Sequence, residues 1–218
     1  MKLLSVDGSG EVLTMALGDG VLLETAGGPS KAPHDERLFP LLERLLARSG
    51  WSPADLDGIV VASGPGRFTG IRVAMTFSSV LGKVLDRPVL VVSRFEAAAY
   101  ASIGQVPAGK EVWVALAGVR EEIFLQPFRA GRSGMTPRKP PAWLKLADAG
   151  AALGPGEILL CGPAAPTLAA VLGERAVVAG SPSDPGAAGL LAPARSLFSR
   201  RVRRAFSPLY LKPAHYER

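Results

Sequence analysis

The sequence predicts an α/β protein of two lobes, and three observations lead to this fold class. Three short β-type runs open the chain around a tight Gly18-Asp19-Gly20 turn, which can adopt the positive φ angles of a hairpin. Helical patterns then alternate with apolar strand-like runs as far as residue 103. A strand, turn and strand pattern begins again near residue 112, so we expect a second, smaller α/β lobe.

The elements of the first lobe follow from their periodicity and end signals. Apolar residues at 38, 41, 42, 45 and 46 have helical spacing and predict a helix. Asp35 is its expected N-cap and Gly50 its expected end. Ser93 followed by Glu96 is a capping-box pair at the start of another helix. We expect strands at Lys2–Val6, Glu11–Leu17, Val21–Thr25, Leu56–Ala62 and Pro88–Val92, and helices between Asp35 and Gly50, at Phe68–Leu85 and at Phe95–Ile103.

The second half has shorter patterns. We expect strands at Val112–Ala117, Ile123–Phe128, Ile158–Cys161 and Ala176–Ala179, and helices at Ala142–Leu153, Pro163–Leu172 and Gly186–Phe198. The N-terminal lobe is therefore predicted at 1–105 and the C-terminal lobe at 106–218. The C-terminal tail is a candidate for packing back on the first lobe.

Composition limits the class of protein. A hydrophobic content of 48% supports a substantial core, and a formal charge of +6 suggests an acidic partner. The apolar run before Asp7 is too short for a signal sequence or a membrane span. Cys161 is the single cysteine and cannot form an intramolecular disulfide. We expect a cytoplasmic protein with no membrane association.

The segment Ser63–Gly70, reading SGPGRFTG, is predicted to be a strand-to-helix turn. Its amides and the helix N-terminus could bind a phosphate, with Asp7 and Ser9 of the first strand-end turn nearby. The candidate phosphate or nucleotide contacts are Asp7, Ser9, Gly64, Gly66, Arg67 and Thr69. The alternative is a close strand–helix crossing that requires small residues, because neither GxxxxGK[ST] nor GxGxxG occurs.

The helix expected at Phe68–Leu85 is apolar on nearly all sides. Such a helix is buried on two faces, either within one domain or against a partner protein. Ala74, Ser78 and Gly82 form a stripe of small residues at which another helix could approach closely. Both interpretations remain open from these residues.

The run Arg200, Arg201, Arg203 and Arg204 is a concentrated positive patch. It is a candidate contact for tRNA phosphates or for an acidic protein face. The alternative is a solvated helix end, where arginine also complements the C-terminal dipole.

The usual catalytic constellations have little support. His34 and His215 are the only histidines, so no HxxxH or HExxH pair can hold a metal. No GxSxG motif presents a nucleophilic serine. We expect no catalytic residue and no metal site.

Several segments resemble the TsaB family, also called YeaZ, of bacterial tRNA threonylcarbamoyladenosine (t6A) synthesis. They are LLSVDGSG, HDERLFPLLERLL, SGPGRFTGIRVA, VVSRFEAAA, VWVALAGVREEIF and SPLYLK. GPGRFTGIR is the most specific of them. The resemblance implies an actin-like, ribonuclease-H-like fold of two lobes with mixed sheets and flanking helices.

The resemblance also implies a function. The chain would be a non-catalytic scaffold or activator for the catalytic subunit TsaD, joined by the ATPase TsaE, in making t6A at position 37 of tRNAs reading ANN codons. It would bind no cofactor alone, with ATP or ADP at the complex interface, would meet tRNA indirectly, and would form a homodimer when alone. The interface residues, on the first two helices, would be Leu38, Leu41, Leu42, Leu45, Ile71, Ala74, Met75, Ser78 and Gly82.

Two departures and one alternative remain. Where the family usually has a DT or DTS turn, this chain has Asp7-Gly8-Ser9. Where the family commonly has a DAR-like turn in the second lobe, this chain has Ala117-Gly118-Val119-Arg120, which weakens a case for nucleotide or metal binding by the chain alone. The alternative function is an independent actin-like, nucleotide-dependent enzyme of kinase or peptidase type, for which Asp7 and the glycine-rich turn are the motivation.

Overall fold

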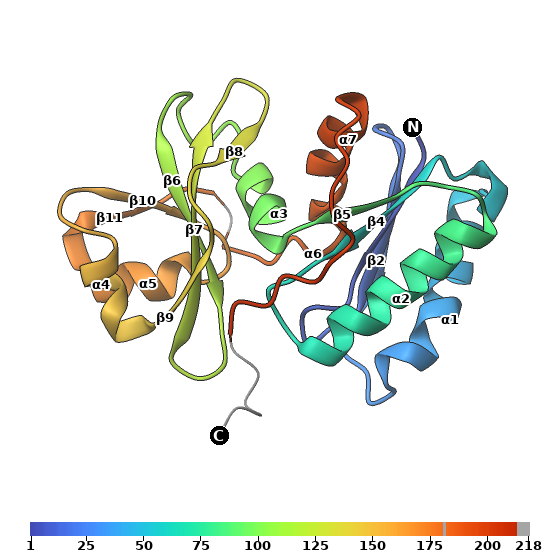
Figure 1. Cartoon of the computed structure of the whole chain (residues 1–218), viewed down its shortest axis with the longest axis horizontal. Coiled ribbons are helices and arrows are strands. Elements are labelled where there is room, and N and C mark those ends of the chain that lie inside the picture. Colours follow the sequence, from blue (N-terminus) through green and yellow to red (C-terminus); the bar gives the residue numbers. More distant parts are fainter. Residues whose placement is uncertain (181, 213–218) are drawn as a thin grey trace. The chain divides into compact units, whose positions relative to one another are not determined.

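A computed structural model describes residues 1–180 and 182–212 of the chain (Figure 1), so His215 lies outside the described residues. The chain divides into two compact units. The first comprises Met1–Ala97 and Pro185–Leu209, and the second comprises Ala98–Asp184 and the chain from Tyr210 onward. The sequence predicts a boundary after residue 105, whereas the division falls inside helix α3 (Arg94–Ala101).

The first unit is built on one mixed sheet. Its strands are β1 (Leu3–Asp7), β2 (Thr14–Gly18), β3 (Leu23–Gly27), β4 (Gly58–Ala62) and β5 (Val89–Val92). The strand order is β3-β2-β1-β4-β5, with β1, β2 and β3 antiparallel and β1, β4 and β5 parallel. The predicted opening of three antiparallel strands is therefore confirmed.

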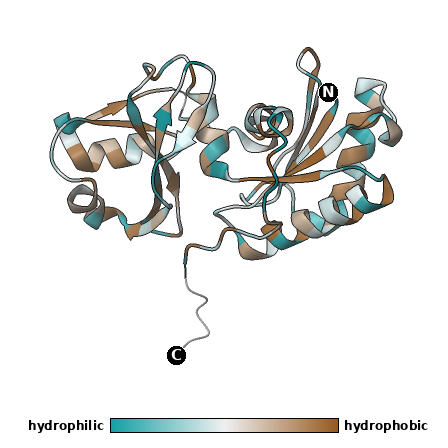
Figure 2. Ribbon diagram, turned by 45° about the horizontal axis from the view of Figure 1, so that its top comes forward, coloured by the Kyte–Doolittle hydropathy of each residue, from teal (hydrophilic) through white to brown (hydrophobic). Residues whose placement is uncertain are grey.

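Helices cover both faces of this sheet. They are α1 (His34–Ser49), the 3-10 turn η1 (Pro53–Asp55), α2 (Phe68–Val84), α6 (Gly186–Gly189) and α7 (Leu191–Ser199). Side chains alternate along β1: Leu4 and Val6 join a core with α1 and α2, whereas Leu3 joins a core with α6 and α7. Figure 2 shows strands mostly in brown and helices in mixed colours, as expected of amphipathic helices on an apolar sheet.

The second unit has a sheet of shorter elements. Its members are β6 (Glu111–Ala117), β7 (Glu122–Ala130), β8 (Met135–Pro137), β9 (Ala142–Lys145), η2 (Leu146–Asp148), α4 (Ala149–Ala152), β10 (Ile158–Cys161), α5 (Ala165–Leu172), η3 (Gly173–Arg175) and β11 (Ala176–Val178). The strand order is β11-β10-β6-β7-β8, and β9 also pairs with β7. Ile123, Leu125 and Leu160 pack with α4 and α5 in its core.

The α/β class with mixed sheets and flanking helices is confirmed, and two local expectations are wrong. Asp35 is not the N-cap of α1, because the helix starts at His34 after Pro33. Residues 142–153 are not one helix, because Ala142–Lys145 pairs with β7 and only a short helix follows. Within the described residues, no helix has both the length and the apolar character needed to cross a membrane.

Candidate functional site

The turn after β1 and the SGPGRFTG segment meet in the first unit. Asp7 is buried at 4% exposure, and its Oδ1 accepts hydrogen bonds from the backbone N–H of Ser9, at 2.8 Å, and from the Ser9 hydroxyl. The Ser9 carbonyl in turn accepts from the backbone N–H of Arg67 at 2.7 Å. Asp7 is therefore occupied in holding its own turn, as Asx side chains commonly are.

The glycines at this junction allow two backbones to touch. A Cβ on Gly66 would overlap the carbonyl oxygen of Ser9, and a Cβ on Gly70 would overlap the carbonyl oxygen of Gly8. Gly64 has a φ of 105°, and a Cβ there would meet Ile71 at 2.8 Å. We call these contacts the glycine junction, defined by Gly8, Ser9, Gly66 and Gly70. They are the close crossing that the sequence leaves open as the alternative to a phosphate cradle.

The six residues predicted to contact phosphate do gather around this junction. Asp7, Ser9 and Gly64 are buried, whereas Arg67 and Thr69 are exposed at the start of α2. Phosphate binding here stays a prediction. The part of this site that a phosphate could still reach is the exposed start of α2. The described residues also contain no group of three or more His, Cys, Asp or Glu side chains that could hold a metal ion.

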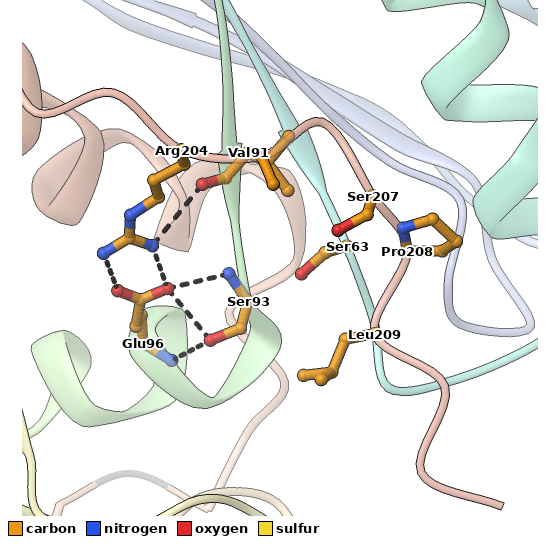
Figure 3. Close-up of a pocket in the computed structure, with 9 residues that line it drawn as sticks. Ser63, Val91, Ser93, Glu96, Arg204, Ser207, Pro208 and Leu209 are labelled. Carbon is orange, nitrogen blue, oxygen red and sulfur yellow. Dashed lines mark hydrogen bonds and ion pairs between the residues drawn. The ribbon is translucent and has the colours of Figure 1, made fainter.

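A small cavity of about 180 Å³ lies close to the same segment, at the ends of β4 and β5 (Figure 3). Its lining consists of Ser63, Val91, Ser93, Glu96, Arg204, Ala205, Ser207, Pro208 and Leu209. The backbone N–H of Leu209 donates to the Ser63 carbonyl at 2.8 Å. The segment after α7 thus returns to the sheet and forms one wall of this cavity.

An ion pair anchors that segment. Arg204 donates from both terminal nitrogens to the Glu96 carboxylate, at 2.8 and 2.7 Å (Figure 3). Glu96 also accepts from the Ser93 backbone N–H at 2.9 Å and from its hydroxyl at 3.0 Å, while the Glu96 N–H donates to the Ser93 hydroxyl at 3.1 Å. The predicted capping box is confirmed, and the bidentate arginine orients the same carboxylate.

Among Arg200, Arg201, Arg203 and Arg204, only Arg204 pairs with Glu96. The sequence predicts Arg204 as a tRNA or acidic-partner contact; in the structure its guanidinium pairs with Glu96, and the contact stays a prediction. Arg200 follows the last turn of α7 and is exposed, as are Arg201 and Arg203. Arg200 and Arg201 lie where cations complement a helix C-terminus.

The predicted partner-interface residues lie in the core of the first unit. Leu38, Leu41, Leu42, Leu45, Ile71, Ala74, Met75 and Ser78 are at most 5% exposed, and Gly82 is also buried. The small-residue stripe faces the unit's own backbone and sheet, because a Cβ on Gly82 would overlap Val89 and Ala74 lies beside Gly8. These side chains pack within the chain, so they do not offer a surface to a partner.

A different set of side chains on the same helices is exposed. Phe39 of α1 is 61% exposed, and Val80 and Val84 of α2 are 57% and 75% exposed. Phe39 packs edge-on against Phe77, with ring centroids 5.3 Å apart, and Phe77, Val80 and Val84 follow one stripe of α2. We call Phe39, Val80 and Val84 the helix-pair surface. Within this chain, helix α2 is therefore buried on one side and open on the other, so burial of its second face against a partner stays a prediction.

The sequence predicts the capping box but neither its arginine partner nor the exposed face of α2. The Ser93–Glu96 pair is recognisable from its spacing, but its partner Arg204 lies 108 residues away from Glu96, and no local pattern marks that contact. The exposed apolar face of α2 was visible in the sequence only as excess hydrophobicity. Which apolar residues face the core depends on the direction from which the sheet meets the helix.

Comparison with known proteins gives consistent matches. A family model described as TsaD, tRNA N6-adenosine threonylcarbamoyltransferase, matches residues 27–159. The tRNA threonylcarbamoyladenosine biosynthesis protein TsaB of Bacillus subtilis is 38% identical over 44% of this chain, and that of Haemophilus influenzae is 30% identical over 59%. These matches span 42% and 55% of the relatives' lengths, which is less than two thirds.

A solved structure agrees over nearly the whole chain. YeaZ from Pseudomonas aeruginosa matches with a TM-score of 0.79 and 25% identity, covering 96% of this chain and 99% of that one. A second structure, of a Pseudomonas aeruginosa protein described as similar to the peptidase YEAZ, gives the same TM-score and identity. The resemblance therefore extends through the C-terminal part of the chain, where the sequence motifs are weakest.

Proposed function

Because this chain belongs to the TsaB (YeaZ) family, we propose that it is a non-catalytic subunit of the bacterial complex that makes t6A at position 37 of tRNAs reading ANN codons. TsaD would be its catalytic partner and TsaE the associated ATPase. The observation that carries this proposal is the agreement of the YeaZ fold over 96% of the chain with the family segments of the N-terminal half.

The helix-pair surface is the proposed contact for TsaD. Phe39, Val80 and Val84 are large apolar side chains exposed together on two adjacent helices. Exposed apolar side chains that gather in one place on a soluble protein commonly mark an interaction site. The same surface would allow two copies of the chain to pair symmetrically when TsaD is absent.

Complementation tests the function directly. A bacterial strain depleted of its own TsaB would be supplied with this gene, and t6A would be measured in digested tRNA by mass spectrometry. Restored t6A is the expected result. A strain that expresses the folded chain together with its cognate TsaD and TsaE and still lacks t6A would contradict the proposal.

Charge insertion tests the contact surface. Val80→Glu combined with Val84→Glu should abolish co-elution with TsaD and shift any homodimer to monomer by light scattering, because two buried carboxylates at an interface lack partners. Ser79→Glu is the matched control, since Ser79 is exposed on the other flank of the same helix. Unchanged co-elution of the double variant, with circular dichroism like wild type, would eliminate this surface.

An adenine nucleotide is part of the same proposal, bound only once TsaD has joined. The buried carboxylate of Asp7 and the glycine junction are occupied by contacts within this chain, which leaves the chain alone with little to offer a nucleotide. Calorimetry with ADP and Mg²⁺ should detect binding to the two-subunit complex and none to the chain alone. Equal binding to the isolated chain would favour the independent-enzyme alternative.

A further inference from the structure

The distribution of charge in the second unit is uneven. Between Glu122 and Asp148 the sequence contains five basic residues and no acidic residue. They are Arg129, Arg132, Arg138, Lys139 and Lys145. This stretch forms β7, β8 and β9, and no part of the proposed function accounts for it.

Most of these cations lie at one end of the β7–β8 hairpin. Arg129 is near the end of β7, Arg132 lies in the turn, and Arg138 directly follows β8, with its N–H bonded to the Pro127 carbonyl at 2.9 Å. Lys110 joins them, because its carbonyl accepts from the N–H of Ala130 at 2.9 Å. Lys139 is adjacent in the chain to Arg138.

We call Lys110, Arg129, Arg132, Arg138 and Lys139 the basic hairpin surface. All five are exposed. Arg129 donates from Nε to the Gly109 carbonyl at 3.3 Å, which uses one of the several N–H donors of its guanidinium. None of the five forms an ion pair with any residue in the described part of the chain, in contrast to Arg48 with Glu24 and Lys212 with Glu122.

One acidic residue faces this surface from the neighbouring strand. Glu111 of β6 stands opposite Arg129 in the antiparallel register, and Thr136 of β8 stands on its other side. Five cations therefore face one carboxylate. Exposed pairs of this kind contribute little to stability, so the surplus charge does not serve to hold the sheet together.

The surface also lacks the apolar groups that a protein interface would bury. Among the described residues, the large exposed hydrophobic side chains include none between Val119 and Val171. Protein interfaces have cores enriched in aromatic residues and Met and depleted of charge. Nucleic acid backbones, by contrast, are contacted mainly through exposed Arg and Lys.

We propose that the basic hairpin surface binds the phosphate backbone of RNA. The proposal rests on the proposed function, which supplies tRNA as the RNA present in the complex. The contacts are to phosphate, so they position the RNA without reading its sequence. Cations near the end of β7, in the turn, directly after β8 and directly before β6 spread this contact along the backbone of the bound RNA.

Binding of an unmodified tRNA transcript tests this surface. The variant Arg132→Ala, Arg138→Ala, Lys139→Ala changes three side chains with no partner among the described residues. Fluorescence anisotropy with the full chain, alone and with TsaD, should show roughly tenfold weaker tRNA binding. The slope of log affinity against log salt should fall by about one for each phosphate that the variant no longer binds.

Lys145→Ala is the matched control. It removes an exposed cation from the same sheet, opposite Glu122 at the far end of β7, about 23 Å along the strand from Arg129. This control should leave tRNA affinity and salt slope within about twofold of wild type.

The outcomes separate the two proposals. If wild-type tRNA affinity and slope persist in the folded triple variant, the surface proposal is overturned, whatever the complementation shows. Loss of co-elution with TsaD and retention of tRNA binding would also overturn it and assign the surface to an acidic protein. If the wild-type gene fails to restore t6A but tRNA binding still depends on these three residues, the RNA surface stands and the proposed function fails.

Discussion

Two segments of this chain combine glycine with arginine, and they serve different ends. In the glycine junction, the absence of side chains on Gly66 and Gly70 lets the backbone of α2 touch the turn after β1. In the basic hairpin surface, the turn from Gly131 to Gly134 closes on itself through a 2.8 Å backbone hydrogen bond and leaves Arg132 exposed. Composition is similar in the two segments, so the difference shows that availability to a ligand is decided by what each segment packs against.

The largest expected effect is at the glycine junction. Gly66→Ala should destabilise the protein by about 3 kcal/mol, because the new Cβ overlaps the Ser9 carbonyl and neither backbone can move freely. Gly10→Ala is the control, since a Cβ there comes no closer than 3.7 Å to another atom. Urea unfolding of both variants measures the difference. Equal stability of the two variants would show that the junction tolerates a side chain and is not closely packed.

The next largest effect is expected at Arg204, in contrast to its neighbour Arg203. Arg204→Ala should cost about 1 to 2 kcal/mol, because it leaves the Glu96 carboxylate, 11% exposed, without its bidentate partner. Arg203→Ala, one residue away and exposed, should change the free energy of unfolding by less than about 0.5 kcal/mol. If both variants lose the same stability, the run acts as one solvated group and the anchoring role of Arg204 is refuted.

A smaller effect depends on pH and lies at the other end of β7. Burial alone would raise the pKa of Glu122, but the hydrogen bond from Lys212, at 2.5 Å, and its charge hold that pKa below the ordinary value of 4.5. A lowered pKa adds stability above the unfolded value, and this contribution is lost as the pH falls below it.

Lys212→Met therefore should destabilise the chain by up to about 1 kcal/mol at neutral pH, and this difference should shrink as the pH falls below about 4.5. Urea titrations of wild type and variant across this range measure it. A difference that stays constant with pH would assign the effect of Lys212 to packing, for example over the Trp143 ring, 5.4 Å from the ammonium.

The smallest expected effect sharpens the comparison. The triple alanine variant of Arg132, Arg138 and Lys139 should change the free energy of unfolding by no more than about 0.5 kcal/mol, as is usual for surface substitutions. Its melting temperature should therefore stay close to that of the wild type. Thermal unfolding followed by circular dichroism measures it. A large loss of stability would mean that these cations support the hairpin itself and would remove the reason to assign them a ligand.

Local pattern predicted much of the fold. Helix α2 starts at Phe68 as expected, strand β10 has the expected bounds of Ile158–Cys161, and Gly50 ends α1 in a left-handed conformation. Residues 142–145 were misassigned because the run Ala-Trp-Leu-Lys suits either structure, and pairing with β7 decides in favour of a strand. Competition of this kind between local preference and sheet pairing is invisible in a single sequence.

The sequence predicts which residues lie together at the candidate site, but not what they do there. The sequence indicates that Asp7, Ser9 and Gly66 belong near one another, and the structure places them at one junction. Whether glycine there admits a phosphate or another backbone depends on distances between segments about sixty residues apart in the chain. The predicted interface leucines lie in the core for a related reason, since periodicity identifies an apolar face without saying what covers it.

The sequence by itself determined the α/β class, the order of most elements and the family, because these depend on periodicity, end signals and short motifs. Only the tertiary structure decided that SGPGRFTG is closed by the Ser9 backbone, that Arg204 is held by Glu96, and that Phe39, Val80 and Val84 remain exposed. The physical reason is that burial and pairing arise between segments far apart in the chain. The residue types determine what each side chain can do chemically, but the packing of the sheets and helices determines which other residues it contacts.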